Sequence, residues 1–388
     1  MITVLYIIDY GTVGGATQAF VWLMHQVKEL GVKPIVVTGK YNELNKKLEN
    51  EGIQTISAGH YTAIDFINFK NLRWPYRLVK RIIKYHVHEY FAIKILEREV
   101  DFTKIDIIHT NSARNTLGCR LSKRYGIPHI VHIREFGDKD FDCIKLTPNY
   151  VSILNHYSTK FLSVSNAVRD YWNSKGILPE KNQTIYDGIN YEDINVSSDD
   201  DKKKKTLKMV INGGVGLPKG QHLVIDAMVL LPQNIRDNIT LDIAGWGDEY
   251  YIKSFMEVAK NAGFDSQVNY LGAIDDVHQR LGDSQIGLMC SRSEGFGLVT
   301  AEYMHGRLGV IASNAGANPE LIEDGVTGLL FESGNAQSLA DCIIRLYNDR
   351  DLLIKVSNSA QAKARMMFTQ QKNAGAIYNV YQEILIKK

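Results

Sequence analysis

Residues 286–302 read Ile-Gly-Leu-Met-Cys-Ser-Arg-Ser-Glu-Gly-Phe-Gly-Leu-Val-Thr-Ala-Glu. The apolar start is typical of a buried strand, and a helical pattern begins at Leu298. Glu294 therefore lies in a strand-to-helix loop, and Glu302 lies about one turn into the helix. The glycines between them let a ligand approach the backbone closely, and a helix start suits phosphate. Because each carboxylate can accept bonds from adjacent hydroxyls, the segment predicts a sugar-nucleotide site.

Short apolar runs of this kind recur along the chain and alternate with helical patterns. They form two series, 4–8, 34–38, 105–109, 129–133, 161–164 and 184–186, and then 208–211, 241–244, 268–271, 286–290, 309–312 and 328–331. Continuous apolar runs favour parallel strands covered on both faces, and repeated strand–helix units indicate an α/β protein. We therefore expect two Rossmann-like, doubly wound parallel-sheet domains with ligands at the carboxyl ends of the strands.

The length of 388 residues also favours two domains over one core. We expect an N-terminal domain over 1–194 and a C-terminal domain over 206–370. Residues 195–205 carry an aspartate block followed by a lysine block. This pattern favours a solvated charged linker over a basic arm for nucleic acid, because the acidic block adjoins the lysines.

Composition excludes several classes of protein. A net charge of +2 argues against general nucleic-acid binding. The four cysteines form no CxxC pair, which argues against a disulfide scaffold or a zinc motif and favours a reducing compartment. The sequence contains no apolar run long enough for a transmembrane helix and no signal-peptide pattern. We therefore expect a cytoplasmic protein, and the sequence leaves its oligomeric state open.

In each series, one glycine-rich turn follows the first strand. Residues 9–16 include Gly14 and Gly15, which suit either a phosphate or a plain tight turn. Residues 211–220 end with Lys219 at a helix start, where a cation opposes the helix dipole unless an anion binds there. The alternative for Lys219 is an ordinary exposed lysine.

His132 follows at the carboxyl end of the strand 129–133, together with Arg134 and Glu135. It is a candidate site residue, and the alternative is a histidine that the sheet itself satisfies. Acidic pairs at 138–140, 140–142 and 199–201 resemble DxD metal motifs. None of them follows a strong strand, so we expect no metal site.

The segment 66–87 holds six basic residues and no acid, with aromatic residues interleaved. A basic, aromatic and partly helical stretch is typical of an element that contacts an anionic membrane surface. The alternative is an ordinary solvated helix.

Several motifs occur together in this one chain: the Glu294–Glu302 pair, the Gly14–Gly15 turn, Pro218-Lys219-Gly220, His132 and the segment 186–190. Together they resemble the retaining glycosyltransferases of family 4, which have the GT-B fold. The resemblance implies two Rossmann-like domains that face each other across a cleft. The C-terminal domain would bind a nucleotide sugar and the N-terminal domain largely the acceptor. The last helix, within about 371–388, would pack back on the N-terminal domain.

The resemblance also implies roles for individual residues. Three would be catalytic: Glu294 holding hydroxyls of the donor sugar, Lys219 neutralising the diphosphate and His132 standing beside the anomeric carbon. Glu302 would hold the ribose. The remaining donor contacts would come from Gly14 and Gly15 at the distal phosphate, from the backbone of Phe296, Gly297, Leu298 and Val299, and from Gly272 and Ile274 at the base.

The chain departs from the family pattern at Gly214, where many members have an arginine. Arg134 and Arg292 are candidates to replace that charge. The expected reaction is metal-independent, retaining transfer from a nucleoside diphosphate sugar, most often a UDP-sugar in this family, with no cofactor. The acceptor would be a hydroxyl of a glycan or lipid-linked intermediate, as in bacterial surface polysaccharide or glycoconjugate synthesis.

Three alternatives stay open from the sequence. A nucleotide-sugar 2-epimerase shares the fold. A catalytically silent GT-B partner protein is favoured by Gly214 and opposed by the intact Glu294, Glu302, Lys219 and His132 set. A nicotinamide dehydrogenase fits worst, because neither glycine turn matches the dinucleotide fingerprint.

Overall fold

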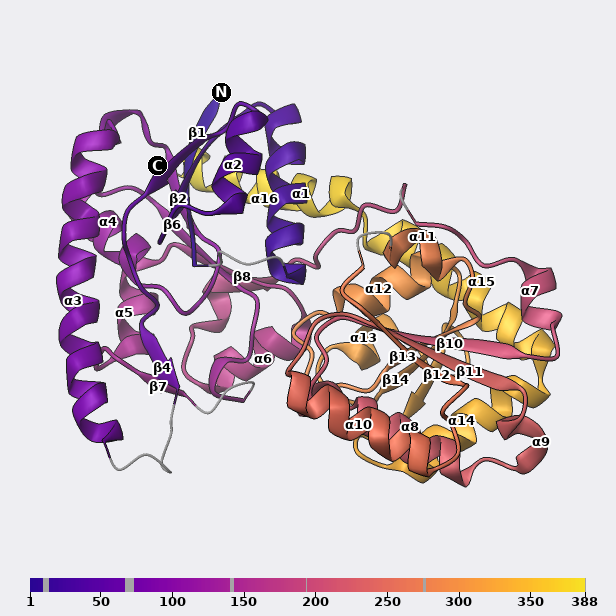
Figure 1. Cartoon of the computed structure of the whole chain (residues 1–388). Coiled ribbons are helices and arrows are strands. Elements are labelled where there is room, and N and C mark those ends of the chain that lie inside the picture. Colours follow the sequence, from indigo (N-terminus) through magenta and orange to yellow (C-terminus); the bar gives the residue numbers. More distant parts are fainter. Residues whose placement is uncertain (10–13, 67–72, 140–142, 193, 275–276, 388) are drawn as a thin grey trace. The chain divides into compact units, whose positions relative to one another are not determined.

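The computed structural model describes the chain except for residues 10–13, 67–72, 140–142, 193, 275–276 and 388. The chain forms two compact units (Figure 1). Unit 1 comprises residues 1–188 and 370–388, and unit 2 comprises residues 189–369. Each unit is built around a parallel sheet, and each is described by itself below.

Unit 1 has a seven-stranded parallel sheet in the order β3-β2-β1-β5-β6-β8-β9, and β4 pairs with β7 in a separate antiparallel ribbon. Its strands are β1 (Ile2–Ile8), β2 (Val32–Thr38), β3 (Gln54–Ser57), β4 (Ile64–Phe66), β5 (Ile107–Thr110), β6 (His129–Ile133), β7 (Cys143–Lys145), β8 (Lys160–Ser163) and β9 (Asn182–Thr184). Its helices are α1 (Gly15–Glu29), α2 (Glu43–Asn50), α3 (Trp74–Glu99), α4 (Leu117–Tyr125), α5 (Tyr150–Tyr157), α6 (Asn166–Ser174) and α16 (Gln370–Ile386).

Alternate side chains of β1 enter two hydrophobic layers. Tyr6 and its neighbours on the same face pack with α1, α2 and α16. Leu5 and Ile7 pack on the other face with α3 and α4. Because both faces are buried, the strand reads as a continuous apolar run. The final helix α16 belongs to unit 1, and its Tyr381 hydroxyl lies 2.9 Å from the Tyr6 hydroxyl inside the core.

Unit 2 has a six-stranded parallel sheet in the order β12-β11-β10-β13-β14-β15. Its strands are β10 (Leu207–Asn212), β11 (Ile239–Ala244), β12 (Val268–Gly272), β13 (Ile286–Met289), β14 (Gly309–Ser313) and β15 (Leu329–Phe331). Its helices are α7 (Asp199–Lys203), α8 (Gln221–Leu230), α9 (Gln233–Arg236), α10 (Glu249–Asn261), α11 (Val277–Leu281), α12 (Leu298–His305), α13 (Asn318–Leu321), α14 (Ala336–Asn348) and α15 (Arg350–Met367). Within unit 2, α8, α10 and α14 cover one face of the sheet, and α11, α12 and α15 cover the other (Figure 1).

The predicted fold class, two parallel-sheet α/β domains, is confirmed. Every strand predicted from an apolar run is present, within a few residues at each end. The structure adds β3, β4 and β7, which the sequence analysis missed. The division between the units falls after residue 188. Residues 195–205, expected to be a solvated linker, instead contain α7 and belong to unit 2. None of the helices in the described part of the chain is long and apolar enough to cross a lipid bilayer.

Buried histidines make the stability of unit 1 depend on pH. His129 lies between the hydroxyls of Thr110, at 2.8 Å, and Ser158, at 3.1 Å. His109 Nδ1 lies 2.6 Å from the Tyr381 hydroxyl. Burial lowers the pKa of both His109 and His129 to about 3. In the unfolded chain an imidazole has a pKa of about 6.5, so acid-induced unfolding takes up protons at both rings.

We therefore expect the free energy of unfolding of unit 1 to fall as the pH drops below about 6.5, by roughly 1.4 kcal/mol per pH unit for each ring. Stability that depends on a neutral histidine is fully present above the unfolded pKa and is lost on acidification. Urea titrations at pH 7.5, 6.0 and 5.0 would measure the slope. His109→Gln should reduce this slope by the contribution of one ring, which is the uptake of about one proton on unfolding. Replacing the exposed His156 should leave the slope unchanged. An unchanged slope in His109→Gln would contradict this assignment.

Candidate functional site

The site in unit 2 lies where the strand order of the sheet reverses. Strand β10 pairs with β11 on one side and with β13 on the other. The chain after β10 and the chain after β13 therefore lead away in opposite directions, which opens a crevice at the carboxyl ends of these strands. Residues 213–220 follow β10, and residues 290–297 follow β13. These are the two segments that the sequence analysis singled out.

Lys219 and Glu294 come together in this crevice. The Lys219 Nζ atom lies 2.5 Å from Glu294 Oε1. The Lys219 side chain is 42% exposed and the Glu294 side chain only 14%, so a cation at the rim pairs with a largely enclosed carboxylate. A positive group that can contact phosphate and an acceptor that can contact sugar hydroxyls are therefore adjacent.

Glycines allow the segments around this pair to approach closely. Gly220 has φ +77°, and a Cβ atom there would lie 2.4 Å from the Cys290 carbonyl oxygen. Gly316 has φ +58°, and a Cβ atom there would likewise lie 2.4 Å from the Glu294 carbonyl oxygen. The Ala317 amide donates to that Glu294 carbonyl at 2.9 Å. The backbone of Glu294 is thus held in place by the segment after β14.

Helix α12 begins directly after Gly297, which has φ +90° and precedes the helix as its N-cap. The first amides of a helix have no partner within it, so those of Leu298 and Val299 are available to a ligand. The Phe296 ring is buried and makes an edge-to-face contact with Phe368, with ring centroids 5.5 Å apart. Phe296 therefore offers its backbone to the site while its ring packs in the core.

Glu302 lies one turn into α12 and has a partner that the sequence analysis missed. Its Oε1 atom lies 3.2 Å from His278 Nε2 on α11. Gly272 ends β12 with φ +69°, and the half-buried Ile274 follows in the segment that leads to α11. Glu302, the residue predicted to hold the ribose, is thus in contact with α11. No motif in the sequence indicated His278.

Asn212 is a second residue that the sequence analysis missed. It ends β10, is 9% exposed, and donates its backbone N–H to the Tyr303 hydroxyl at 2.7 Å. Among the described residues, neither polar atom of its carboxamide has a hydrogen-bond partner. Unsatisfied buried polar groups are rare and often mark functional positions. The signal in the sequence is a polar residue directly after an apolar run, at the switch point.

The other predicted residues lie in unit 1. Helix α1 begins at Gly15, and both Gly14 and Gly15 are exposed. Residues 10–13 of the same turn lie outside the described part of the chain. His132 on β6 is fully buried with its ring centroid 5.5 Å from that of His109. Burial, and then the charge of Arg134, lower the pKa of His132 well below 6.5, so the ring is neutral. The roles of these three residues stay predictions.

Arg134 does not supply the charge that Gly214 lacks. Its Nη1 atom lies 2.7 Å from Asp187 Oδ2, and both side chains are 4% exposed. Its Nε atom donates to Asn111 at 2.9 Å. A buried arginine paired in this way is committed to its carboxylate. Arg292, the other candidate, is exposed on the site segment, and its backbone amide donates to the Pro218 carbonyl at 3.2 Å.

The acidic pairs that resemble DxD motifs have other roles where they are described. Asp138 lies 3.2 Å from Lys175 Nζ, and residues 140–142 lie outside the described part. Asp199 pairs with Arg307, and Asp201 caps α7 together with Ser198. Within the described residues, no group of three or more histidine, cysteine or acidic side chains is placed to hold a metal ion. Metal independence of the reaction stays a prediction.

Comparisons with known proteins agree with this architecture. Residues 193–382 match the family model of the glycosyl transferases group 1, and residues 13–193 match that of glycosyltransferase family 4. The capsular polysaccharide biosynthesis glycosyltransferase CapH of Staphylococcus aureus is 24% identical over 83% of this chain and 84% of its own length. The lipopolysaccharide core mannosyltransferase LpcC of Rhizobium leguminosarum is 30% identical over 45% of this chain and 50% of its own.

Solved structures show the same fold. HepE from Anabaena in complex with UDP and glucose has a TM-score of 0.77 at 20% identity, covering 99% of this chain and 100% of that one. Sucrose-phosphate synthase from Thermosynechococcus elongatus has a TM-score of 0.78 at 15% identity, covering 100% of both chains. The fold is thus that of the GT-B glycosyltransferases. More particularly, the chain belongs to the glycosyl transferases of group 1, which confirms the resemblance to family 4.

Proposed function

We propose that this glycosyltransferase moves a sugar from a nucleoside diphosphate donor, a UDP-sugar first of all, to a hydroxyl of a glycan or lipid-linked acceptor. The observation that carries the proposal is the Lys219–Glu294 contact of 2.5 Å at the switch point of unit 2. Support for UDP comes from the likeness in fold to HepE, whose structures hold UDP and glucose. Support for a surface-polysaccharide acceptor comes from the relatives in capsule and lipopolysaccharide synthesis.

The proposed chemistry follows from charge development at the leaving group. As the bond to the sugar breaks, the diphosphate gains negative charge, which the Lys219 ammonium and the first amides of α12 would stabilise. Glu294 would then release Lys219 to the phosphate and accept hydrogen bonds from the sugar. Neither role requires a metal. Retention of configuration at the anomeric carbon is part of the proposal. The acceptor hydroxyl would attack from the face that the diphosphate leaves, its oxygen would bond to the anomeric carbon as the bond to the diphosphate breaks, and its proton would pass to an oxygen of the departing diphosphate.

A donor screen tests this proposal. Released nucleoside diphosphate is measured with UDP-, GDP- and ADP-sugars, with and without lipid-linked acceptors, and in EDTA. We expect release that depends on an acceptor and survives EDTA. Free sugar without an acceptor would identify a 2-epimerase instead. Calorimetry that detects no nucleoside diphosphate binding would favour the silent partner protein. Loss of activity in EDTA that manganese restores would overturn the metal-independent part.

Glu294→Gln is expected to lower kcat about a hundredfold while the fold is unchanged. The amide keeps the size of the side chain but removes the charge, and a hydrogen bond to a charged group contributes roughly 1.5–3 kcal/mol. Steady-state rates with the donor found in the screen measure the loss, and circular dichroism checks the fold. Glu257→Gln on α10, an exposed position, is the matched control. Transfer at the wild-type rate would remove Glu294 from the mechanism.

The proposal includes peripheral association with an anionic membrane through α3. This helix lies along the surface of unit 1 (Figure 1). Five large apolar side chains at helical spacing are each 46–63% exposed along one stripe, namely Tyr76, Val79, Ile83, Val87 and Tyr90. The basic residues Arg77, Lys80, Arg81 and Lys84 are interleaved with the first half of the stripe. Basic residues contribute about 1 kcal/mol each near an anionic surface, which favours lipid over a solvated face.

Ile83→Glu is therefore expected to weaken binding to vesicles of phosphatidylglycerol and phosphatidylcholine at least tenfold. The substitution removes an apolar side chain whose burial contributes roughly 1.5–3 kcal/mol. It also adds a negative charge that the anionic surface repels. Co-sedimentation with the vesicles measures the partition. Val258→Glu, at an exposed position on α10 of unit 2, should leave the partition unchanged. Equal binding of the wild type to neutral and anionic vesicles would argue against this role of α3.

A further inference from the structure

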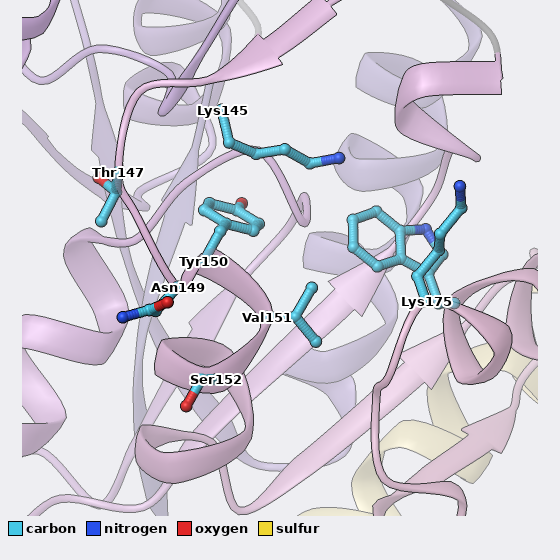
Figure 2. A pocket seen from close by; sticks show the side chains of 8 residues that line it. Lys145, Thr147, Asn149, Tyr150, Val151, Ser152 and Lys175 are labelled. Atoms are coloured by element: carbon cyan, nitrogen blue, oxygen red, sulfur yellow. The ribbon is translucent and has the colours of Figure 1, made fainter.

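We infer that a cavity in unit 1, beside the carboxyl end of β6, binds a sugar that carries an acidic group, and that this is the acceptor subsite. The cavity measures about 430 Å³, within the range of small-molecule sites. It lies among β7, the start of α5 and the end of α6 (Figure 2). The role as acceptor subsite rests on the proposed transferase function, whereas the binding itself does not.

Two aromatic rings form the apolar part of the cavity. The Trp172 indole is 4% exposed, and its Nε1–H donates to the Glu135 carbonyl at 2.8 Å. Gly137, with φ +77°, packs its backbone against the same ring. Trp172 is thereby fixed against the segment that follows β6. The Tyr150 ring lies on the other side with Val151 beside it (Figure 2). Flat, rigid rings of this kind suit the apolar faces of a sugar ring.

Two lysines give the cavity a positive charge. Lys145 and Lys175 both line it. The Lys145 Nζ atom lies 6.0 Å from the centroid of the Trp172 ring. Both ammonium groups share one carboxylate, Asp138, at 3.8 Å from Lys145 and 3.2 Å from Lys175. Within the described residues, these two cations and one anion leave a net positive charge at the cavity. The hydrogen bond that Lys175 donates to Asp138 raises the pKa of Lys175, so this lysine is charged at neutral pH.

Two hydroxyl-bearing residues line the same cavity and have unused hydrogen-bonding capacity. Thr147 is 8% exposed and Tyr150 is 4% exposed. Within the described residues, neither hydroxyl has a hydrogen-bond partner. Buried polar groups normally have partners, and these two hydroxyls are unsatisfied in residues of the cavity wall. Burial also raises the pKa of Tyr150 well above 10, which keeps its hydroxyl a donor.

Taken together, these groups define the class of ligand. The rings favour a pyranose, the hydroxyls favour its polar edge, and the ammonium groups favour a carboxylate or a phosphate on it. Lysine acts on an anion as a point charge and does not impose the bidentate geometry of arginine. A uronic acid and a sugar phosphate therefore share the chemistry that this cavity recognises, and the experiment compares them.

The test is direct binding to the full chain. Glucuronate, glucose 1-phosphate and neutral glucose are titrated by calorimetry into the wild type and into Lys145→Ala/Lys175→Ala. We expect at least one acidic sugar to bind the wild type about tenfold more tightly than glucose, because two partly exposed charge contacts together contribute an affinity difference of that size. The double variant should lose this preference, and high salt should reduce it. Lys253→Ala/Lys260→Ala on α10 removes the same charge from exposed positions of unit 2 and should retain the preference.

Equal binding of glucose and both acidic sugars, or an unchanged preference in Lys145→Ala/Lys175→Ala, would overturn the inference. Nucleoside diphosphate binding, titrated in parallel, separates this result from the proposed function. If the protein binds nucleoside diphosphate but shows no preference for acidic sugars, the acidic-sugar site is refuted and the transferase proposal is unaffected. A preference for acidic sugars without nucleoside diphosphate binding would support the acidic-sugar site and refute its role as an acceptor subsite.

Discussion

Lys219→Ala is expected to lower kcat/KM for sugar transfer by two to three orders of magnitude. Lys219 is the cation that contacts Glu294 in the crevice of unit 2. At about 4 Å and an effective dielectric constant near 20, one charge pair contributes about 4 kcal/mol before desolvation. The 42% exposure of the side chain reduces this value, and each 1.4 kcal/mol corresponds to a factor of ten in rate. Because Gly214 stands where many family members have an arginine, less charge remains to replace Lys219.

The measurement is the initial rate of nucleoside diphosphate release, with Lys253→Ala as a charge-matched control at an exposed position of α10. Lys219→Arg keeps the charge and should recover part of the rate. The double variant Lys219→Ala/Glu294→Gln should lose less than the two single losses combined, because groups in contact are not additive. Wild-type transfer by Lys219→Ala, or full additivity in the double variant, would show that the two side chains do not act together.

Much of this site could be predicted because its signal is local in sequence. The strand, the glycine loop and the helix at 286–302 each have their own pattern, so Glu294 and Glu302 were recognisable directly. The Lys219–Glu294 contact was not, because it joins residues 75 positions apart. Its placement depends on the strand order, which puts β13 next to β10. His278 carries no motif, and only its contact with Glu302 gives it a role. Asn212 shows only a polar residue after an apolar run, and its place at the switch point depends on the strand order.

The fold shows the same division between local and tertiary information. Most of the predicted strands are buried on both faces, and their apolar runs are therefore continuous; the edge strands β9 and β12 are only partly buried. Strand β3 was missed because Ile56 is the one buried residue in this edge strand. The charged segment 195–205 was misjudged for the opposite reason. Lys202 is fully buried, and its Nζ atom donates to the Ser197 carbonyl at 2.9 Å within a packed helix. Burial lowers the pKa of Lys202 to about 8. A charge pattern alone does not reveal such a contact.

Arg134→Ala is expected to lower the free energy of unfolding of unit 1 by about 3–5 kcal/mol. The ion pair with Asp187 is buried on both sides, at 2.7 Å. Removal of one partner leaves an uncompensated carboxylate in the core, which costs much more than the net contribution of the pair. The side-chain oxygen of Asn111 also loses the hydrogen bond that it accepts from Arg134 Nε. Urea unfolding at pH 7.5, followed by circular dichroism, measures the loss. Arg169→Ala, on the surface of the same unit, should change stability by less than about 1 kcal/mol.

The sign of the pH dependence identifies the cause of this loss. Burial raises the pKa of Asp187 and Arg134 opposes that rise, so the pKa of the carboxyl group should be higher still in Arg134→Ala. A folded-state pKa above the unfolded value of about 3.9 means that the folded variant gains stability as the pH falls. The difference in stability between the wild type and Arg134→Ala should therefore shrink from pH 7.5 to pH 5. Loss of Arg134 also removes a charge that lowers the pKa of His109 and His132, and this acts in the same direction because the folded variant then takes up protons more readily. Arg134→Met/Asp187→Leu, which removes both charges, should recover most of the loss. If the difference is the same at both pH values and the double variant recovers nothing, lost packing rather than a stranded charge explains the effect.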